Sequence, residues 1–242
     1  VFILAIPLCF LGVVFGDSYS FHACPLESLA QASHPYLANP VYPRRYNRVI
    51  CRDWSAAHAG IIAGGGGLAS ELVSGLEIWI NPLANPDGAY RNGDTIVYPV
   101  RANSNGYDLN RNFPDPEASP PPPLQKETID MMKFLEAKRF ALSVNLHSGA
   151  EVVNYPWDRW TRIHPDDAWF NTISRRYADT VHLHAEPGYM TFLNDGVTRG
   201  WEWYVITGGR QDFVTWGLGG REITIEIDDT KLTPGSNLEA MW

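Results

Sequence analysis

The sequence has little cysteine, a modest number of basic residues and no apolar run long enough to span a membrane. Three Cys in 242 residues are too few for a disulfide framework. The formal net charge of −8 leaves no basic surface to neutralise phosphates, which argues against a nucleic-acid partner. The apolar run Val1–Phe15 falls short of the roughly 20 residues of a membrane helix, so we expect no stable membrane insertion.

The apolar start of the chain is instead typical of the core of a signal peptide. Small residues at Val14 and Gly16 would allow cleavage before Asp17. The sequence therefore predicts a signal peptide over residues 1–16 and a secreted or periplasmic protein. No Met and no basic residue precedes the run, as expected for a truncated start. A buried strand or helix is the alternative interpretation of the run.

Aromatic residues are plentiful, and the remaining chain divides into two parts. An aromatic content of 12% with nine Trp is typical of a globular enzyme. Residues 17–74 show little periodicity and contain the run Gly64–Gly67. No Gly-Lys-Ser/Thr follows that run, so a linker or non-native sequence is expected rather than a phosphate loop. The 242 residues are long enough for one domain with a substantial core and too short for two large ones.

Strand and helix patterns alternate in this second part, which favours a layered α/β domain. Residues 81–124 are expected to be mostly loop. The predicted helices cover residues 127–138 and 166–182, and the predicted strands cover residues 76–80, 140–146, 151–155 and 223–227. One face of the second helix is expected to carry Trp169, Phe170, Ile173, Tyr177 and Val181.

The segment Asp108–Pro114 places an amide next to a guanidinium, at Asn110 and Arg111. Arg111 can donate two parallel hydrogen bonds to a free carboxylate, and Asn110 can add a third. Such a pair also occurs in ordinary polar loops, so its meaning depends on the segments that accompany it.

Several further motifs accompany that pair in a fixed order, namely Asn85–Gly88, Leu146–Gly149, Asn154–Pro156, Trp203–Tyr204, Gly208–Asp212 and Glu222–Glu226. From about Gly75 to Trp242 the chain resembles the zinc carboxypeptidases, specifically the carboxypeptidase N/E-like branch and its secreted bacterial type. The resemblance implies a three-layer α/β/α fold with a mixed central sheet, here with its N-terminal part missing or altered. We predict an unmatched segment over residues 17–74 and a catalytic domain over residues 75–242.

By this resemblance His147 is a ligand of Zn²⁺ and Glu226 is the general base. Zinc with one open position activates a water, and a carboxylate takes the proton of that water and passes it to the leaving amine. Without the resemblance, His147 would be interpreted as a core or loop histidine, and Glu226 as a carboxylate facing water. Glu222 lies on the same strand face as Glu226, so the motif match alone selects Glu226.

The resemblance also assigns residues around the scissile bond. Arg101 stands where the family keeps an arginine that stabilises the oxyanion, although a solvated loop cation is the alternative. Asn110 and Arg111 are expected to hold the terminal carboxylate. Tyr204 resembles the mobile tyrosine that closes over the substrate, where Trp203–Tyr204 alone would indicate core packing.

Two positions bear on specificity. Asp158 and Gln211 match positions that carry an acidic and an amide group in this branch, where they receive a Lys or Arg side chain. A buried carboxylate facing a cation is a reasonable pocket floor, since an unpaired buried charge is costly. A surface aspartate is the alternative for Asp158.

One family motif is absent. The first two zinc ligands would come from a His-x-x-Glu motif upstream of Asn85–Gly88, but His22, His34 and His58 are each followed at the third position by another residue type. One hypothesis is that residues of roughly 18–74 are out of register with the true gene product. The other is that the chain is a zinc-free relative that binds peptide C-termini without cutting them.

We therefore predict a secreted, monomeric zinc metallocarboxypeptidase that removes C-terminal residues, Lys or Arg, from peptides or proteins. The alternative is a zinc-free, inactive relative that binds peptide C-termini. Glycoside hydrolysis by paired carboxylates would leave His147 and the Asn110–Arg111 pair unexplained.

Overall fold

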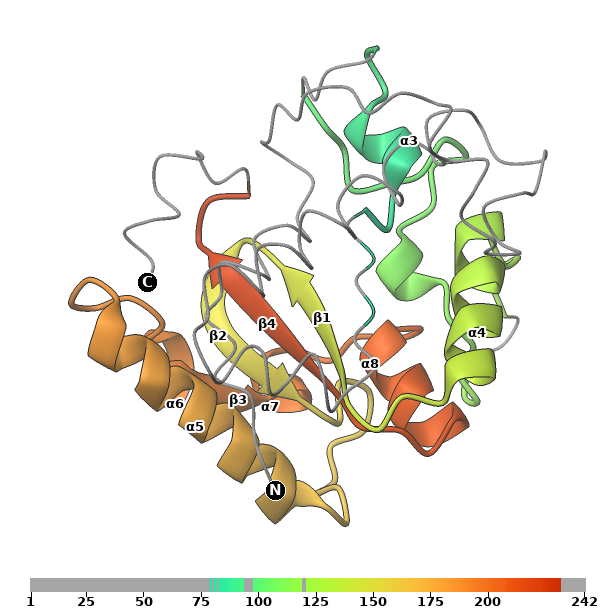
Figure 1. Ribbon diagram of the computed structural model, residues 1–242. Coiled ribbons are helices and arrows are strands. Elements are labelled where there is room, and N and C mark those ends of the chain that lie inside the picture. The colour runs from blue at the N-terminus through green and yellow to red at the C-terminus, as the bar shows by residue number, and fades with distance from the viewer. Residues whose placement is uncertain (1–78, 80, 82, 94–97, 119–120, 232–242) are drawn as a thin grey trace. The chain divides into compact units, whose positions relative to one another are not determined.

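The computed structural model describes residues 79, 81, 83–93, 98–118 and 121–231 (Figure 1). The predicted signal peptide, the segment 17–74 and almost all of the predicted strand 76–80 lie outside these residues. The chain divides into two compact units, with the boundary between Pro99 and Val100. In the part of the chain that the structure describes, no helix is both long and apolar enough to cross a membrane.

In the first unit, the Asn-Pro-Asp-Gly motif forms a short capped helix, α3 (Pro86–Ala89). The Asn85 side chain accepts a hydrogen bond of 3.0 Å from the Gly88 N–H. Pro86 occupies the first helical turn, where its missing N–H costs nothing. The motif is thus a rigid turn rather than an irregular loop.

The second unit is built on a four-stranded mixed sheet. Its strands are β1 (Ser143–His147), β2 (Ala150–Tyr155), β3 (Val197–Arg199) and β4 (Glu222–Asp228), in the order β1-β4-β2-β3. β1 runs parallel to β4, β2 runs antiparallel to β4, and β3 runs parallel to β2. Every residue of β4 is buried, because this strand lies inside the sheet and both of its faces are covered.

Helices lie on both sides of this sheet, as predicted (Figure 1). α5 and α6 pack against β2, whereas α8 packs against β4. The helices are α4 (Lys126–Lys138), α5 (Asp167–His184), α6 (Phe192–Gly196), α7 (Gly200–Trp203) and α8 (Arg210–Asp212), with a 3₁₀ turn η4 (Leu109–Arg111) and a π turn η5 (Phe213–Gly217). The α/β fold with a mixed central sheet is therefore confirmed.

The predicted strand 140–146 begins three residues late, at Ser143. Arg139 ends α4 in a left-handed conformation with φ 49°. The chain then turns back, so that the Phe140 ring packs 5.4 Å from the ring of Phe134. Phe140 thus joins the core beside α4 instead of opening the strand.

The buried face of α5 also differs from the prediction. Phe170, Ile173 and Val181 are buried as expected, but Ser174 and Ala178 complete that face. The predicted members Trp169 and Tyr177 are only half-buried. Small side chains at the centre of a helix face allow close packing, which moves the large rings to the margins.

A small apolar cluster holds the segment that follows Arg111. Phe113, Leu135, Phe213 and Val214 are buried together, which ties this segment to α4 and η5. The Phe113 N–H also donates to the Gly208 carbonyl at 3.0 Å. The Asn-Arg pair is therefore carried by a packed part of the domain.

Candidate active site

His147 and Glu226 face each other on neighbouring strands. Each is paired with the other in the register of β1 and β4. His147 Nδ1 lies 3.9 Å from Glu226 Oε1. Both side chains are largely removed from solvent, with 19% and 9% exposed. The sheet therefore fixes an imidazole beside a carboxyl group.

The turn that carries the Asn-Arg pair is held by Asp108. Its Oδ1 accepts from the Asn110 N–H at 3.0 Å, which caps η4. Its Oδ2 lies 2.5 Å from Arg101 Nε, and its backbone pairs with Ala102. Arg101 and Asn110 are thus attached to one residue, which limits their relative movement.

Asn110 connects this turn to the sheet. Its Nδ2 lies 3.5 Å from His147 Nε2, and its Oδ1 accepts from the Arg210 N–H at 2.9 Å. Arg111 Nη1 donates to the Asn110 carbonyl at 2.7 Å. Asn110 and Arg111, the predicted clamp for the terminal carboxylate, therefore lie next to His147 in a turn that we call the clamp turn.

The protein environment shifts the pKa values of His147 and Glu226 in opposite directions. Burial, followed by the positive charges of Arg101 and Arg210, lowers the pKa of His147 to about 4. Burial raises the pKa of Glu226 to about 7, although Arg101 and Lys231 act against that change. With these pKa values the imidazole is uncharged at neutral pH, and both the protonated and the ionised form of the Glu226 carboxyl group are populated.

Asp158 and Gln211 are in direct contact. Gln211 Nε2 donates to Asp158 Oδ1 at 2.9 Å and to Asn154 Oδ1 at 2.7 Å. Asp158 is only 4% exposed, so it is not a surface aspartate. Burial, followed by the nearby charge of Asp212, raises the pKa of Asp158 well above its usual range.

Backbone hydrogen bonds hold this pair in place. Asp212 accepts from the Asp158 N–H at 3.0 Å and from the Arg159 N–H at 2.8 Å. A Cβ on Gly200 would collide with the Asp158 carboxylate. The loop that carries Asp158 is therefore closely packed between α7 and α8.

Tyr204 lies at the end of α7 and is partly exposed to solvent. The residue is 46% exposed, which argues against core packing. Its ring lies 4.7 Å from that of Trp203, and its N–H donates to the Gly200 carbonyl at 3.0 Å. These contacts attach Tyr204 to α7 and do not join it to His147 or Glu226, so its closure over a substrate stays a prediction.

Sequence reasoning missed two residues that contact the site, Asn145 and Arg210, and the buried partner of Arg210, Glu222. Asn145 Nδ2 lies 3.1 Å from His147 Nε2. The period of two along β1 could have revealed it, because residues two apart share a strand face. Arg210 was not selected, and Glu222 was considered only as a rival of Glu226, yet Arg210 Nη2 and Glu222 Oε2 form a 3.0 Å ion pair.

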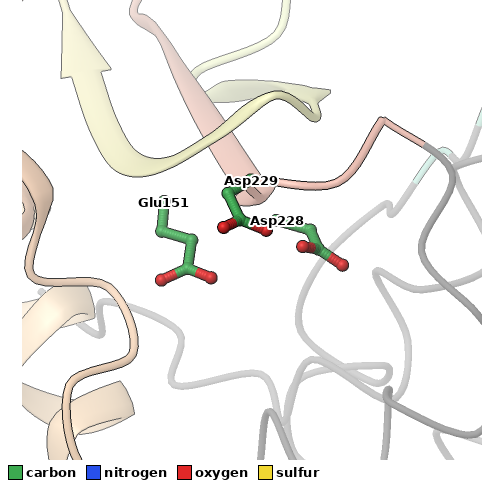
Figure 2. A group of neighbouring side chains, drawn as sticks. All are labelled: Glu151, Asp228 and Asp229. Carbon is green, nitrogen blue, oxygen red and sulfur yellow. The ribbon is translucent and has the colours of Figure 1, made fainter.

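Among the described residues, the side chains around His147 do not supply the three protein ligands that a catalytic zinc ion needs. In the described part of the chain, the single group of three metal-binding side chains is Glu151, Asp228 and Asp229 (Figure 2). This group contains neither His147 nor Glu226, and the full sequence has no His-x-x-Glu motif.

Comparison with known proteins places these motifs in a family. Residues 64–242 match the zinc carboxypeptidase family. Over 188 residues the chain is 37% identical to carboxypeptidase D of Mus musculus, which covers 72% of this chain and 14% of that protein. It is 32% identical to the carboxypeptidase N catalytic chain of Rattus norvegicus over 209 residues, which covers 71% of this chain and 46% of that protein.

A solved structure supports the same fold. The carboxypeptidase A from Helicoverpa armigera superposes with a TM-score of 0.54 at 19% identity, covering 66% of this chain and 46% of that chain. The chain thus spans less than half the length of each of these relatives. The extent of the family match and the identity to these relatives show that the chain belongs to the zinc carboxypeptidase family.

Proposed function

We propose that this domain binds the C-terminal residue of a peptide or protein, and that the complete enzyme releases that residue, with a preference for Lys or Arg. The observation that carries the proposal is the position of His147. Its ring lies 3.5 Å from the Asn110 amide on one side and 3.9 Å from the Glu226 carboxyl on the other. A carboxylate-binding group and a proton-transfer group therefore converge on one imidazole.

The terminal carboxylate would bind at Asn110 and Arg111. The Asn110 Oδ1 is occupied by the Arg210 N–H, so its NH₂ group is the part that remains for a carboxylate. Arg111 uses Nη1 within its own turn and has further guanidinium donors. Donors fixed by the fold lose little freedom when a ligand binds, which favours affinity.

The preference for Lys or Arg rests on Asp158 and Gln211. The Gln211 Oε1 is buried and has no hydrogen-bond partner. An unsatisfied buried acceptor is costly, and a substrate that donates to it removes the cost. A Lys or Arg side chain would supply both that donor and a positive charge for Asp158, which a neutral side chain cannot do.

Hydrolysis would use Glu226 for proton transfer. The carboxylate would take a proton from the attacking water and deliver it to the leaving amine. Arg101 would stabilise the negative charge on the carbonyl oxygen. Asp108 holds the Arg101 guanidinium through a 2.5 Å contact, which would fix its position during the reaction.

A second candidate is a domain that binds peptide C-termini without cutting them. The observation that favours it is the donor set, because His147 is the one zinc ligand that the family motifs assign in this sequence. The binding groups Asn110, Arg111, Asp158 and Gln211 do not depend on a metal. Both candidates therefore share the same recognition of the chain end.

One experiment separates the two candidates. The full chain is incubated with a peptide ending in Arg, with and without added zinc, and free arginine and bound zinc are measured. Arginine release together with stoichiometric zinc supports the hydrolase. Binding of the peptide with neither release nor zinc supports the binding domain, and absence of both binding and release contradicts the proposed function.

A further inference from the structure

Glu222 is the most completely buried carboxylate near the site, and the roles proposed above do not use it. Its exposed fraction is 0%. It opens β4, four residues before Glu226 and on the same strand face. Its Oε2 accepts from the Ser143 hydroxyl and from Arg210 Nε and Nη2, the latter two at 3.1 and 3.0 Å.

Arg210 is joined at its other end to the proposed clamp. Its backbone N–H donates to Asn110 Oδ1 at 2.9 Å. One residue thus anchors its guanidinium on β4 and presents its N–H to the clamp. The contacts form a continuous path from Glu222 through Arg210 to Asn110, and from there to His147.

This path determines which end of the Asn110 amide is free. An N–H donor can be accepted by the amide oxygen and not by the NH₂ group. With Oδ1 held by Arg210, the NH₂ group must point elsewhere, and it lies 3.5 Å from His147 Nε2. A carboxylate needs donors, so this orientation suits its binding.

The segment around Arg210 is also tightly packed. Gly208 has φ +66°, and a Cβ there would lie 2.6 Å from the Arg111 carbonyl oxygen. The Gly208 carbonyl accepts from the Phe113 N–H. Because residues 208–210 run against the clamp turn, a shift of Arg210 would be passed to Asn110.

We propose that the Arg210–Glu222 ion pair is a positioning device that orients Asn110 for a terminal carboxylate. This inference rests on the proposed function, because it assumes that Asn110 binds the chain end. Arg210 acts here through its backbone N–H and is a positioning residue. Glu222 acts one step further away, as the buried anchor of the Arg210 guanidinium.

The test compares a peptide ending in Arg with its C-terminal amide. The ratio of the two Kd values for the full chain isolates recognition of the carboxylate. In Arg210→Met/Glu222→Leu both charges are removed together, since removing one would leave the other buried and unpaired. We expect the amide-to-acid Kd ratio to fall about tenfold, the loss of one well-placed hydrogen bond to a charged group.

A matched control removes another charge pair of the same unit. Arg199 Nε lies 2.6 Å from Asp167 Oδ1, which joins β3 to α5. The variant Arg199→Met/Asp167→Leu should keep the amide-to-acid ratio of the parent chain. Loss of this ratio in the control to the same degree would show a general structural effect and would overturn the inference.

Two single variants keep the test decisive if the double variant does not fold. Arg210→Lys keeps the charge and the backbone donor, so it should retain most of the ratio. Glu222→Gln weakens the anchor without changing its shape and should lower the ratio about threefold. A parent-like ratio in a folded double variant or in Glu222→Gln overturns the positioning role. A parent chain that binds acid and amide equally contradicts the proposed function instead.

Discussion

Gln211 donates its amide to Asp158 at 2.9 Å while its own carbonyl oxygen remains buried without a partner. Asp158, which accepts this bond, is itself only 4% exposed. The pair therefore combines a buried acid with an unsatisfied acceptor. A cationic ligand with N–H donors would stabilise both, because it pairs with the carboxylate and donates to the acceptor.

Replacing Asp158 should change specificity more than general binding. In Asp158→Asn the negative charge is lost while the size is kept. Removing one partner of a buried charge pair costs about 2 kcal/mol or more, or roughly 30-fold in affinity. We expect this loss for peptides ending in Arg and little change for peptides ending in Leu, measured by calorimetry. Equal losses for both peptides would exclude the pocket assignment.

Binding of an Arg-terminated peptide should depend on pH through the two buried acids Asp158 and Asp212. The pKa of Asp158 is raised well above its usual range, and that of Asp212 is raised to about 6. A cationic side chain favours the ionised carboxylate, so its binding must release a proton wherever the free pair is protonated. Affinity should therefore rise with pH.

The measurement is the Kd of the Arg and Leu peptides between about pH 5 and about pH 8. Affinity for the Arg peptide should increase with pH across this window, because burial raises the pKa of both Asp158 and Asp212. Affinity for the Leu peptide provides the control, because it should show no such increase. Parallel pH profiles for the two peptides would contradict proton-linked recognition.

If the chain hydrolyses peptides, Glu226→Gln should abolish most of the turnover. Removal of a general base costs about 10²–10⁴ in rate, while the binding groups at Asn110 and Asp158 remain. Arginine release and peptide Kd are measured in parallel. Glu151→Gln, on the neighbouring strand β2, is the matched control and should retain turnover. Full activity in Glu226→Gln would refute the role given to this carboxyl group.

Gly208→Ala should destabilise the unit that carries the site. The residue has φ +66°, and its Cβ would lie 2.6 Å from the Arg111 carbonyl oxygen. We expect a loss of about 2 kcal/mol or more in the free energy of unfolding, measured by urea denaturation.

Gly106→Ala separates backbone strain from steric collision. Gly106 has φ +82° and no heavy atom within 4 Å of a built Cβ. Its replacement should cost only the conformational term, about 1 kcal/mol. If Gly208→Ala and Gly106→Ala lower the free energy of unfolding equally, the close approach of residue 208 to the clamp turn does not contribute to the loss of stability.

The helices and strands could be predicted from the sequence because they rest on local patterns, whereas the site residues were assigned by the family resemblance. α4 and α5 lie within two residues of their predicted positions, since helical periodicity is a strong signal. β1 began later than expected, because Arg139 adopts a left-handed turn and Phe140 packs on Phe134. No local pattern reveals such a tertiary contact.

The same limit explains what was missed in the site. The motif match selected Glu226 over Glu222, but it gave no reason for Glu222 to be buried. That reason is the guanidinium of Arg210, which arrives from twelve residues earlier along the chain. Likewise the burial of Asp158 depends on Gln211 and Asp212, which are distant in sequence. Pairings of this kind appear only once the chain is folded.

The most direct measurement is the affinity of the full chain for one peptide ending in Arg, as its free acid and as its amide. The contacts at Asn110 and Arg111 predict that the amide binds at least about tenfold more weakly, because it offers neither the charge nor the second acceptor. Equal affinity for the two forms would contradict recognition of the chain end at this site.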